Sequence, residues 1–117
     1  MHISVTLDCA DPERLAEFWT QALNYRKEEL REPYLVLRPI GDSSAPSLCL
    51  QRVPEARAGK NRMHLDLNVD DVEGSMDRLL VLGATRRSEE VLYRMYRWFV
   101  LADPEGNEFC VIGRTDR

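Results

Sequence analysis

The chain has 117 residues and a net charge of −4, from 16 basic and 20 acidic side chains. A chain of this length forms one domain, and its hydrophobic fraction of 44% is enough for a core. The composition excludes a disordered tail, a collagen and a small disulfide scaffold. No apolar run has the length of a membrane span, and the acidic balance argues against a nucleic-acid partner.

Three cysteines, Cys9, Cys49 and Cys110, lie far apart in the sequence and form no CxxC motif. Neither a zinc knuckle nor a thioredoxin-type pair is therefore expected. The first residues lack the charged and apolar segments of a secretory signal. An odd number of cysteines without an export signal is typical of a reducing compartment, so the predicted location is the cytoplasm.

The first half of the chain predicts one helix and four strands. Residues 3–9 alternate apolar and polar side chains, which is the period of a strand with one apolar face. Asp11 and Pro12 then suit the start of a helix, and Asn24 suits its C-terminal end. The apolar stripe of this helix is Leu15, Phe18, Trp19, Ala22 and Leu23. Further strands are expected at residues 25–30, 34–38 and 47–53, with a turn at 39–46.

After a polar segment at residues 54–61, the same pattern begins again. Residues 63–69 alternate, Asp70 and Asp71 precede a second helix, and Gly83 ends it. Strands are expected at residues 84–88, 96–102 and 107–113, with a tight turn at 103–107. The halves match at a shift of 60 residues for the first strand and 59 for the last, which aligns Gln51 with Cys110.

This repeat predicts an α+β fold with two tandem βαβββ modules. They cover residues about 1–54 and about 62–117, with a linker at about 55–61, in a single domain of residues 1–117. Neither module is large enough to bury a core alone, so the two are expected to pair. The expected architecture is a curved mixed sheet around a concave cavity, with the helices outside.

The polar faces of these strands carry the candidate site residues. They are Ser4, Thr6, Gln51, His64, Asp66, Glu108 and Cys110, and Trp98 would add an apolar wall. Two interpretations are open: the face is simply solvated, or it lines a small-molecule pocket. His64 is the candidate catalytic residue, because Asp66 shares its face and a pocket histidine can bind an acidic ligand or move a proton. A lone histidine is also a common structural residue.

Three segments carry a family resemblance: residues 7–12 with Phe18-Trp19 and 22–25, the second start at 64–71, and the turn segment 101–109. They resemble the vicinal oxygen chelate superfamily, which contains glyoxalase I, extradiol dioxygenases, fosfomycin-resistance enzymes and bleomycin-binding proteins. Phe18-Trp19 and residues 61–66 are similar to the bacterial glyoxalase-like domain branch in particular. The resemblance supports the fold better than the activity, because this fold hosts several chemistries.

The resemblance also implies where a divalent metal would bind. Metal-using members place one ligand on the first and one on the last strand of each module, which gives Ser4, Gln51, His64 and Cys110 here. The family pattern is two His with one or two Glu, and this sequence keeps His64 alone. We therefore expect no metal in the usual site; if one binds, its ligands would be His64, Cys110 and Gln51. His2, two residues before Ser4, is a further candidate ligand.

Two function classes remain open. The first is a metal-free small-molecule binding protein that resembles the bleomycin-resistance members. The second is an enzyme of the superfamily, a lyase, isomerase or dioxygenase-like activity, with His64 as metal ligand or general base. A regulatory module that has lost its chemistry is a third. Unpaired strand edges and the resemblance both predict a homodimer.

Overall fold

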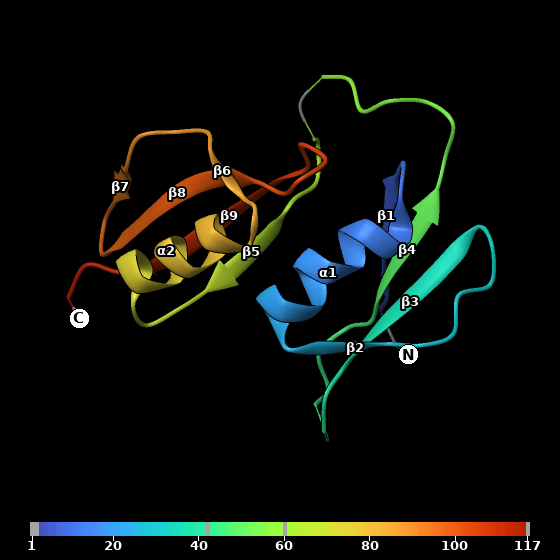
Figure 1. Ribbon diagram of the computed structural model, residues 1–117. Helices are drawn as coiled ribbons and strands as arrows, with labels where there is room; N and C mark the ends of the chain where they lie inside the picture. Colours follow the sequence, from blue (N-terminus) through green and yellow to red (C-terminus); the bar gives the residue numbers. More distant parts are fainter. Residues whose placement is uncertain (1–2, 42, 60, 117) are drawn as a thin grey trace. The chain divides into compact units, whose positions relative to one another are not determined.

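The computed structural model describes residues 3–41, 43–59 and 61–116, and His2 lies outside them. The chain divides into two compact units, Met1–Arg57 and Ala58–Arg117 (Figure 1). The division falls inside the polar segment at residues 54–61. Each unit contains one helix and its own mixed sheet.

Unit 1 is a four-stranded sheet with one helix. Its elements are β1 (Val5–Cys9), α1 (Pro12–Leu23), β2 (Tyr25–Lys27), β3 (Tyr34–Pro39) and β4 (Leu48–Arg52). The strand order is β1-β4-β3-β2, in which β1 is parallel to β4 and the other pairs are antiparallel.

The helix of unit 1 begins and ends where its capping residues predict. The Asp11 side chain accepts a hydrogen bond from the Arg14 backbone nitrogen at 3.2 Å, and Asn24 adopts a left-handed conformation with φ of 58°. Trp19 is buried, and its ring meets Phe18 edge to face at 5.0 Å. The core of the unit also contains Leu15, Leu35, Leu37, Leu48 and Leu50.

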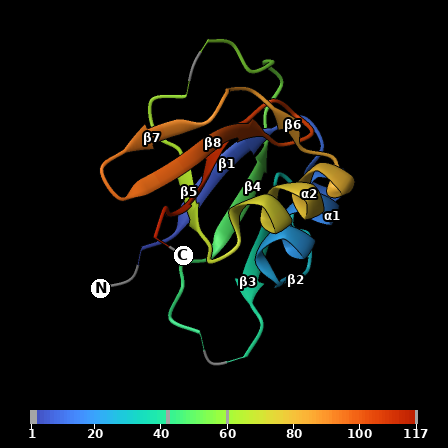
Figure 2. The same cartoon turned by 90° about the vertical axis from the view of Figure 1, so that its left-hand side faces the viewer.

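Unit 2 repeats this plan and adds one strand. Its elements are β5 (Leu65–Asn68), α2 (Val72–Leu82), β6 (Thr85–Arg86), β7 (Val91–Tyr93), β8 (Tyr96–Ala102) and β9 (Glu108–Arg114). The strand order is β5-β9-β8-β6, β5 is parallel to β9, and α2 packs against β9. Figure 2 shows β7 beside β8, with which it forms an antiparallel pair.

The strand β7 is an addition to the βαβββ plan predicted for the second module. The strand has three residues and lies between the charged residues Glu90 and Arg94. A segment this short shows no clear alternation of apolar and polar residues in the sequence. Arg94 has φ of 56°, so the turn from β7 to β8 uses a left-handed residue that is not glycine.

The first strand of unit 2 is shorter and less buried than its pattern predicts. The strand was expected from residue 63, but β5 begins at Leu65, and the residue Met63 is 89% exposed. Leu65 and Leu67 are half-buried. These residues are less buried because β5 lies at the edge of its sheet, where it has a neighbour on one side among the described strands.

The turn from β8 to β9 is held by a buried carboxylate. Asp103 is 2% exposed, and it accepts hydrogen bonds from the backbone nitrogens of Glu105 and Asn107 at 2.9 Å. The amide of Asn107 also donates to this carboxylate, at 3.0 and 3.1 Å. These bonds fix the start of β9 and hence the direction of its side chains.

The described residues contain two helices and nine strands in two mixed sheets, which confirms the α+β prediction. Neither described helix has the length and apolar character needed to cross a bilayer.

Candidate functional site

A cleft of about 460 Å³ opens on the polar face of the sheet of unit 2. It has the volume that small-molecule sites usually have. Its lining residues come from β5, β8 and β9 and from the segments before β5 and after β6. They are Asn61, His64, Asp66, Arg87, Ser88, Trp98, Val100, Glu108, Phe109, Cys110 and Ile112.

The cleft brings together the candidate residues that the sequence places in the second module. His64, Asp66, Trp98, Glu108 and Cys110 all line it. The register explains why: Cys110 on the central strand β9 is opposite Asp66 of β5 on one side and Val100 of β8 on the other. Trp98 lies two residues from Val100 on the same face of β8, as the period of a strand requires.

His64 and Asp66 form an ion pair at the edge of the cleft. The Nδ1 atom of His64 lies 3.0 Å from an Asp66 carboxylate oxygen, and both side chains are partly exposed. Because a carboxylate can only accept, Nδ1 carries the proton in this pair, which leaves Nε2 as an acceptor when the imidazole is neutral. The arrangement supplies an oriented base or, after protonation, a cation.

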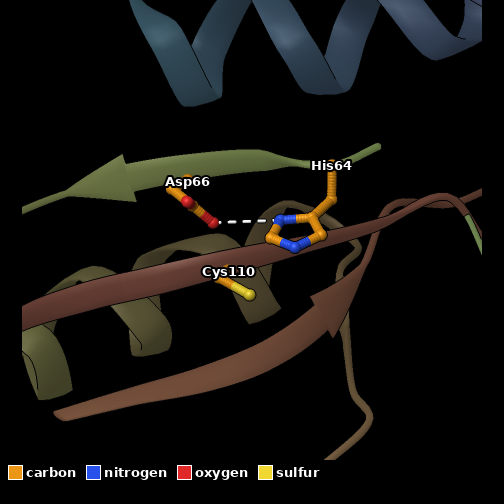
Figure 3. A group of neighbouring side chains, drawn as sticks. All are labelled: His64, Asp66 and Cys110. Atoms are coloured by element: carbon orange, nitrogen blue, oxygen red, sulfur yellow. Dashed lines mark ion pairs between the residues drawn. The ribbon is translucent and has the colours of Figure 1, made fainter. Parts of the chain in front are cut away.

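Cys110 completes a compact group with this pair. The Cys110 sulfur, a His64 ring nitrogen and an Asp66 oxygen all lie within 4.8 Å of one another. Figure 3 shows the carboxylate pointing toward the imidazole ring, with the sulfur of Cys110 near the same ring. The Cys110 residue is 8% exposed, whereas the other two are exposed.

Sequence reasoning missed three polar residues of the cleft: Asn61, Arg87 and Ser88. The Arg87 backbone nitrogen donates to the Val100 carbonyl oxygen at 2.8 Å, which continues the β6–β8 pairing by one residue. The Ser88 hydroxyl accepts a hydrogen bond from the Val100 nitrogen at 2.9 Å. The expected strand at residues 84–88 contained both residues, but the pattern there did not show which face was apolar.

The remaining candidates, Ser4, Thr6 and Gln51, belong to unit 1. Thr6 is on β1, Ser4 comes just before it, and Gln51 is on β4. A hollow on the sheet of unit 1 has other lining residues, namely Glu28, Glu29, Arg31, Tyr34, Val36 and Cys49.

The register of the two sheets corrects the expected alignment of the repeat. Cys49 is opposite Thr6 and Val36, as Cys110 is opposite Asp66 and Val100. The counterpart of Cys110 is therefore Cys49, at a shift of 61 residues. Gln51 is opposite Tyr34, as Ile112 is opposite Trp98, so its counterpart is Ile112. The sequence alignment was displaced by two residues because a two-residue slip in a strand keeps the apolar alternation intact.

The group His64, Asp66 and Cys110 has potential donor atoms that lie within 4.8 Å of one another, so by distance it could hold a metal ion. Its donor set differs from the two His with one or two Glu that the superfamily resemblance implies. Asp66 is also already bonded to His64 Nδ1, so a metal on Nε2 would keep Asp66 as the partner of a ligand. Two direct ligands would then remain in this group, one nitrogen and one sulfur.

The sequence from residue 4 to residue 112 matches the family model described as a glyoxalase-like domain. The chain therefore belongs to this family, and with it to the vicinal oxygen chelate superfamily. No curated protein matches the chain.

Solved structures share the fold at low sequence identity. A glyoxalase/bleomycin resistance protein/dioxygenase family enzyme from Burkholderia phytofirmans PsJN superimposes with a TM-score of 0.77 at 18% identity, covering 95% of this chain and 96% of that one. The fosfomycin resistance protein FosX from Listeria monocytogenes gives 0.76 at 14% identity, covering 97% and 92%. FosX from Mesorhizobium loti gives 0.72 at 18% identity, covering 97% and 91%. At these identities the likeness shows the fold alone.

Proposed function

We propose that the cleft of unit 2 reversibly binds a small organic molecule with an apolar body and a polar end, without the usual metal of the superfamily. The observation that carries this proposal is the composition of the cleft of about 460 Å³. Trp98, Val100 and Ile112 give an apolar wall, and His64, Arg87 and Glu108 give a few separate polar groups. This mixture is typical of small-molecule sites.

Ligand-detected NMR with benzamide, benzoate and benzylamine tests this function. The three probes share an aromatic body and differ in charge, so their ranking reports which polar group of the cleft contributes most. We expect saturation transfer to at least one probe, and we expect Trp98→Ala to weaken it about tenfold. Tyr34→Ala, which removes an exposed aromatic ring on β3 outside the cleft, serves as the matched control. Absence of binding by all three probes would count against the proposal.

Enzymatic use of His64 is the second candidate function. The bond between Asp66 and Nδ1 favours it, because a carboxylate that orients an imidazole prepares Nε2 to accept a proton from a bound substrate. The reaction types that the superfamily resemblance implies for such a base are those of a lyase, an isomerase or a dioxygenase-like enzyme. Loss of turnover in His64→Ala with retained probe binding would distinguish this function from binding alone.

We also propose that the protein is a homodimer in the cytoplasm. The sheet of unit 2 ends at β5, and exposed apolar side chains, Leu92, Tyr93 and Tyr96, lie on β7 and β8. Strand edges and apolar surface of this kind are commonly covered by a partner. Light scattering at micromolar concentration should give twice the chain mass of 13.6 kDa. A single-chain mass would overturn this assembly.

A further inference from the structure

Cys110 lies in the cleft next to a histidine that a carboxylate orients. Its sulfur belongs to the group in which all three potential donor atoms lie within 4.8 Å of one another. The carboxylate of Asp66 holds Nδ1 of His64 at 3.0 Å, so the neutral imidazole has Nε2 available to take a proton. Proteins activate a thiol with these same components, a nucleophile, a base and a group that orients the base, when the thiol comes within hydrogen-bond reach of the base.

Cys49 provides a comparison within the same chain. It has the register position in unit 1 that Cys110 has in unit 2, and it is more exposed than Cys110. Ser4 and Thr6 stand where unit 2 has His64 and Asp66, so unit 1 offers no imidazole at these positions.

We propose that Cys110 is a reactive thiol, activated by His64 and positioned with the help of Asp66, that adds to α,β-unsaturated carbonyl compounds entering the cleft. The Cys110 S–H proton passes to Nε2 of His64. The sulfur then forms a bond to the β-carbon, and the electron pair of the C=C bond moves to the α-carbon. The imidazolium returns its proton to that carbon, so the product is a thioether without a leaving group or a redox partner.

The reactivity of Cys110 is independent of which molecule binds reversibly in the cleft. It requires the thiol, the imidazole and access for a small electrophile, and the lining of the cleft by Cys110 provides that access. A noncovalent ligand could bind while Cys110 stays inert, and Cys110 could react in the absence of any such ligand. The two proposals therefore fail separately.

Labelling with N-ethylmaleimide at pH 7 in the presence of a chelator tests the inference. Peptide mass spectrometry follows Cys9, Cys49 and Cys110 over time in the full chain. We expect Cys110 to react at least about tenfold faster than Cys49, although its residue is the less exposed of the two. Equal rates, or a faster reaction of Cys49, would overturn the inference, because exposure alone would then explain the labelling.

Variants identify the group that activates the thiol. His64→Ala should slow Cys110 about tenfold or more, Asp66→Asn should slow it by less, and Asp77→Asn on the exposed side of α2 should leave it unchanged. The buried Cys9 reports opening of unit 1, and thermal unfolding of each variant reports whether unit 2 stays folded. If the alanine variant loosens the fold, His64→Gln keeps the size and polarity of the side chain. An unchanged Cys110 rate in the folded variant would show that His64 plays no part.

Discussion

The guanidinium of Arg97 on β8 is bonded to the carboxylate of Glu73 in the first turn of α2, so one ion pair ties the helix of unit 2 to its sheet. Glu90 binds the same guanidinium from the segment before β7. The hydrogen bond from Arg97 lowers the pKa of Glu73, and the bond to Glu73 raises the pKa of Arg97. Both shifts favour the charged forms of the pair.

This pair predicts an acid-dependent loss of stability. Because the folded-state pKa of Glu73 is below its unfolded value, its stabilisation is fully present above about pH 4.5. It is lost as the pH falls through the lowered folded-state pKa. Glu73→Gln should therefore be less stable than the wild type at pH 7, and the difference should shrink below pH 4.5. Urea unfolding at several pH values measures this, and Asp77→Asn on the same helix is the control. A difference that does not change with pH would contradict the assignment.

Substitution of His64 should affect the site more than the fold. The His64 side chain is 42% exposed, so His64→Ala should cost about 1 kcal/mol or less. Leu101→Ala removes a side chain with no exposed surface from β8, and it should cost about 2–5 kcal/mol. Leu65→Ala should lower the free energy of unfolding by an intermediate amount, because Leu65 is half-buried. The sequence pattern alone predicts a loss as large as that for a fully buried leucine. Denaturant titration of the three variants gives this order. Equal losses for His64→Ala and Leu101→Ala would identify His64 as a structural residue.

Purified protein should contain less than one divalent metal ion per chain. The reason is the donor set: Asp66 is bonded to His64, and the thiol of Cys110 stands where the superfamily resemblance implies a carboxylate. Elemental analysis for zinc, nickel, manganese and iron, after purification without chelator, measures the content. One ion per chain in the wild type that disappears in His64→Ala would mean that the group rearranges to bind a metal.

The Asp103 turn should be sensitive to loss of its carboxylate. Asp103→Ala would leave the backbone nitrogen of Asn107 and its side-chain amide without their acceptor in a buried setting. Each unsatisfied buried donor costs about 1–3 kcal/mol, so the free energy of unfolding should fall by several kcal/mol. Asp103→Asn retains one acceptor oxygen and should cost less. Thermal unfolding of both variants, with Glu108→Gln after the turn for comparison, measures the effect.

The local start and stop signals were the most predictable part of this protein. The backbone nitrogens of the first helical turn need an acceptor, and Asp11 and Asp71 provide it three residues before Arg14 and Gly74. Such bonds connect residues that are close in the sequence, so they can be predicted without knowledge of the tertiary structure. The alternation of β8 was equally clear, and its observed bounds are those expected, residues 96–102.

Contacts between distant segments were harder to predict. Alternation gives the face of a strand but not its register, so the sequence aligned Cys110 with Gln51, whereas the strand pairing aligns it with Cys49. Arg87 and Ser88 are held at the cleft by hydrogen bonds to the backbone of Val100, one from the Arg87 nitrogen and one to the Ser88 hydroxyl. No periodic pattern in the sequence predicts these bonds.

The sequence by itself therefore determined the α+β class, the helix caps and the polar faces that carry His64, Asp66 and Cys110, because each depends on neighbours within a few residues. The tertiary structure alone decided which strands pair and in which register. Pairing brings residues more than 40 positions apart, such as Asp66 and Cys110, to opposite places on adjacent strands. The close approach of the thiol to the Asp66–His64 pair follows from that register, and so does the chemistry we propose for it.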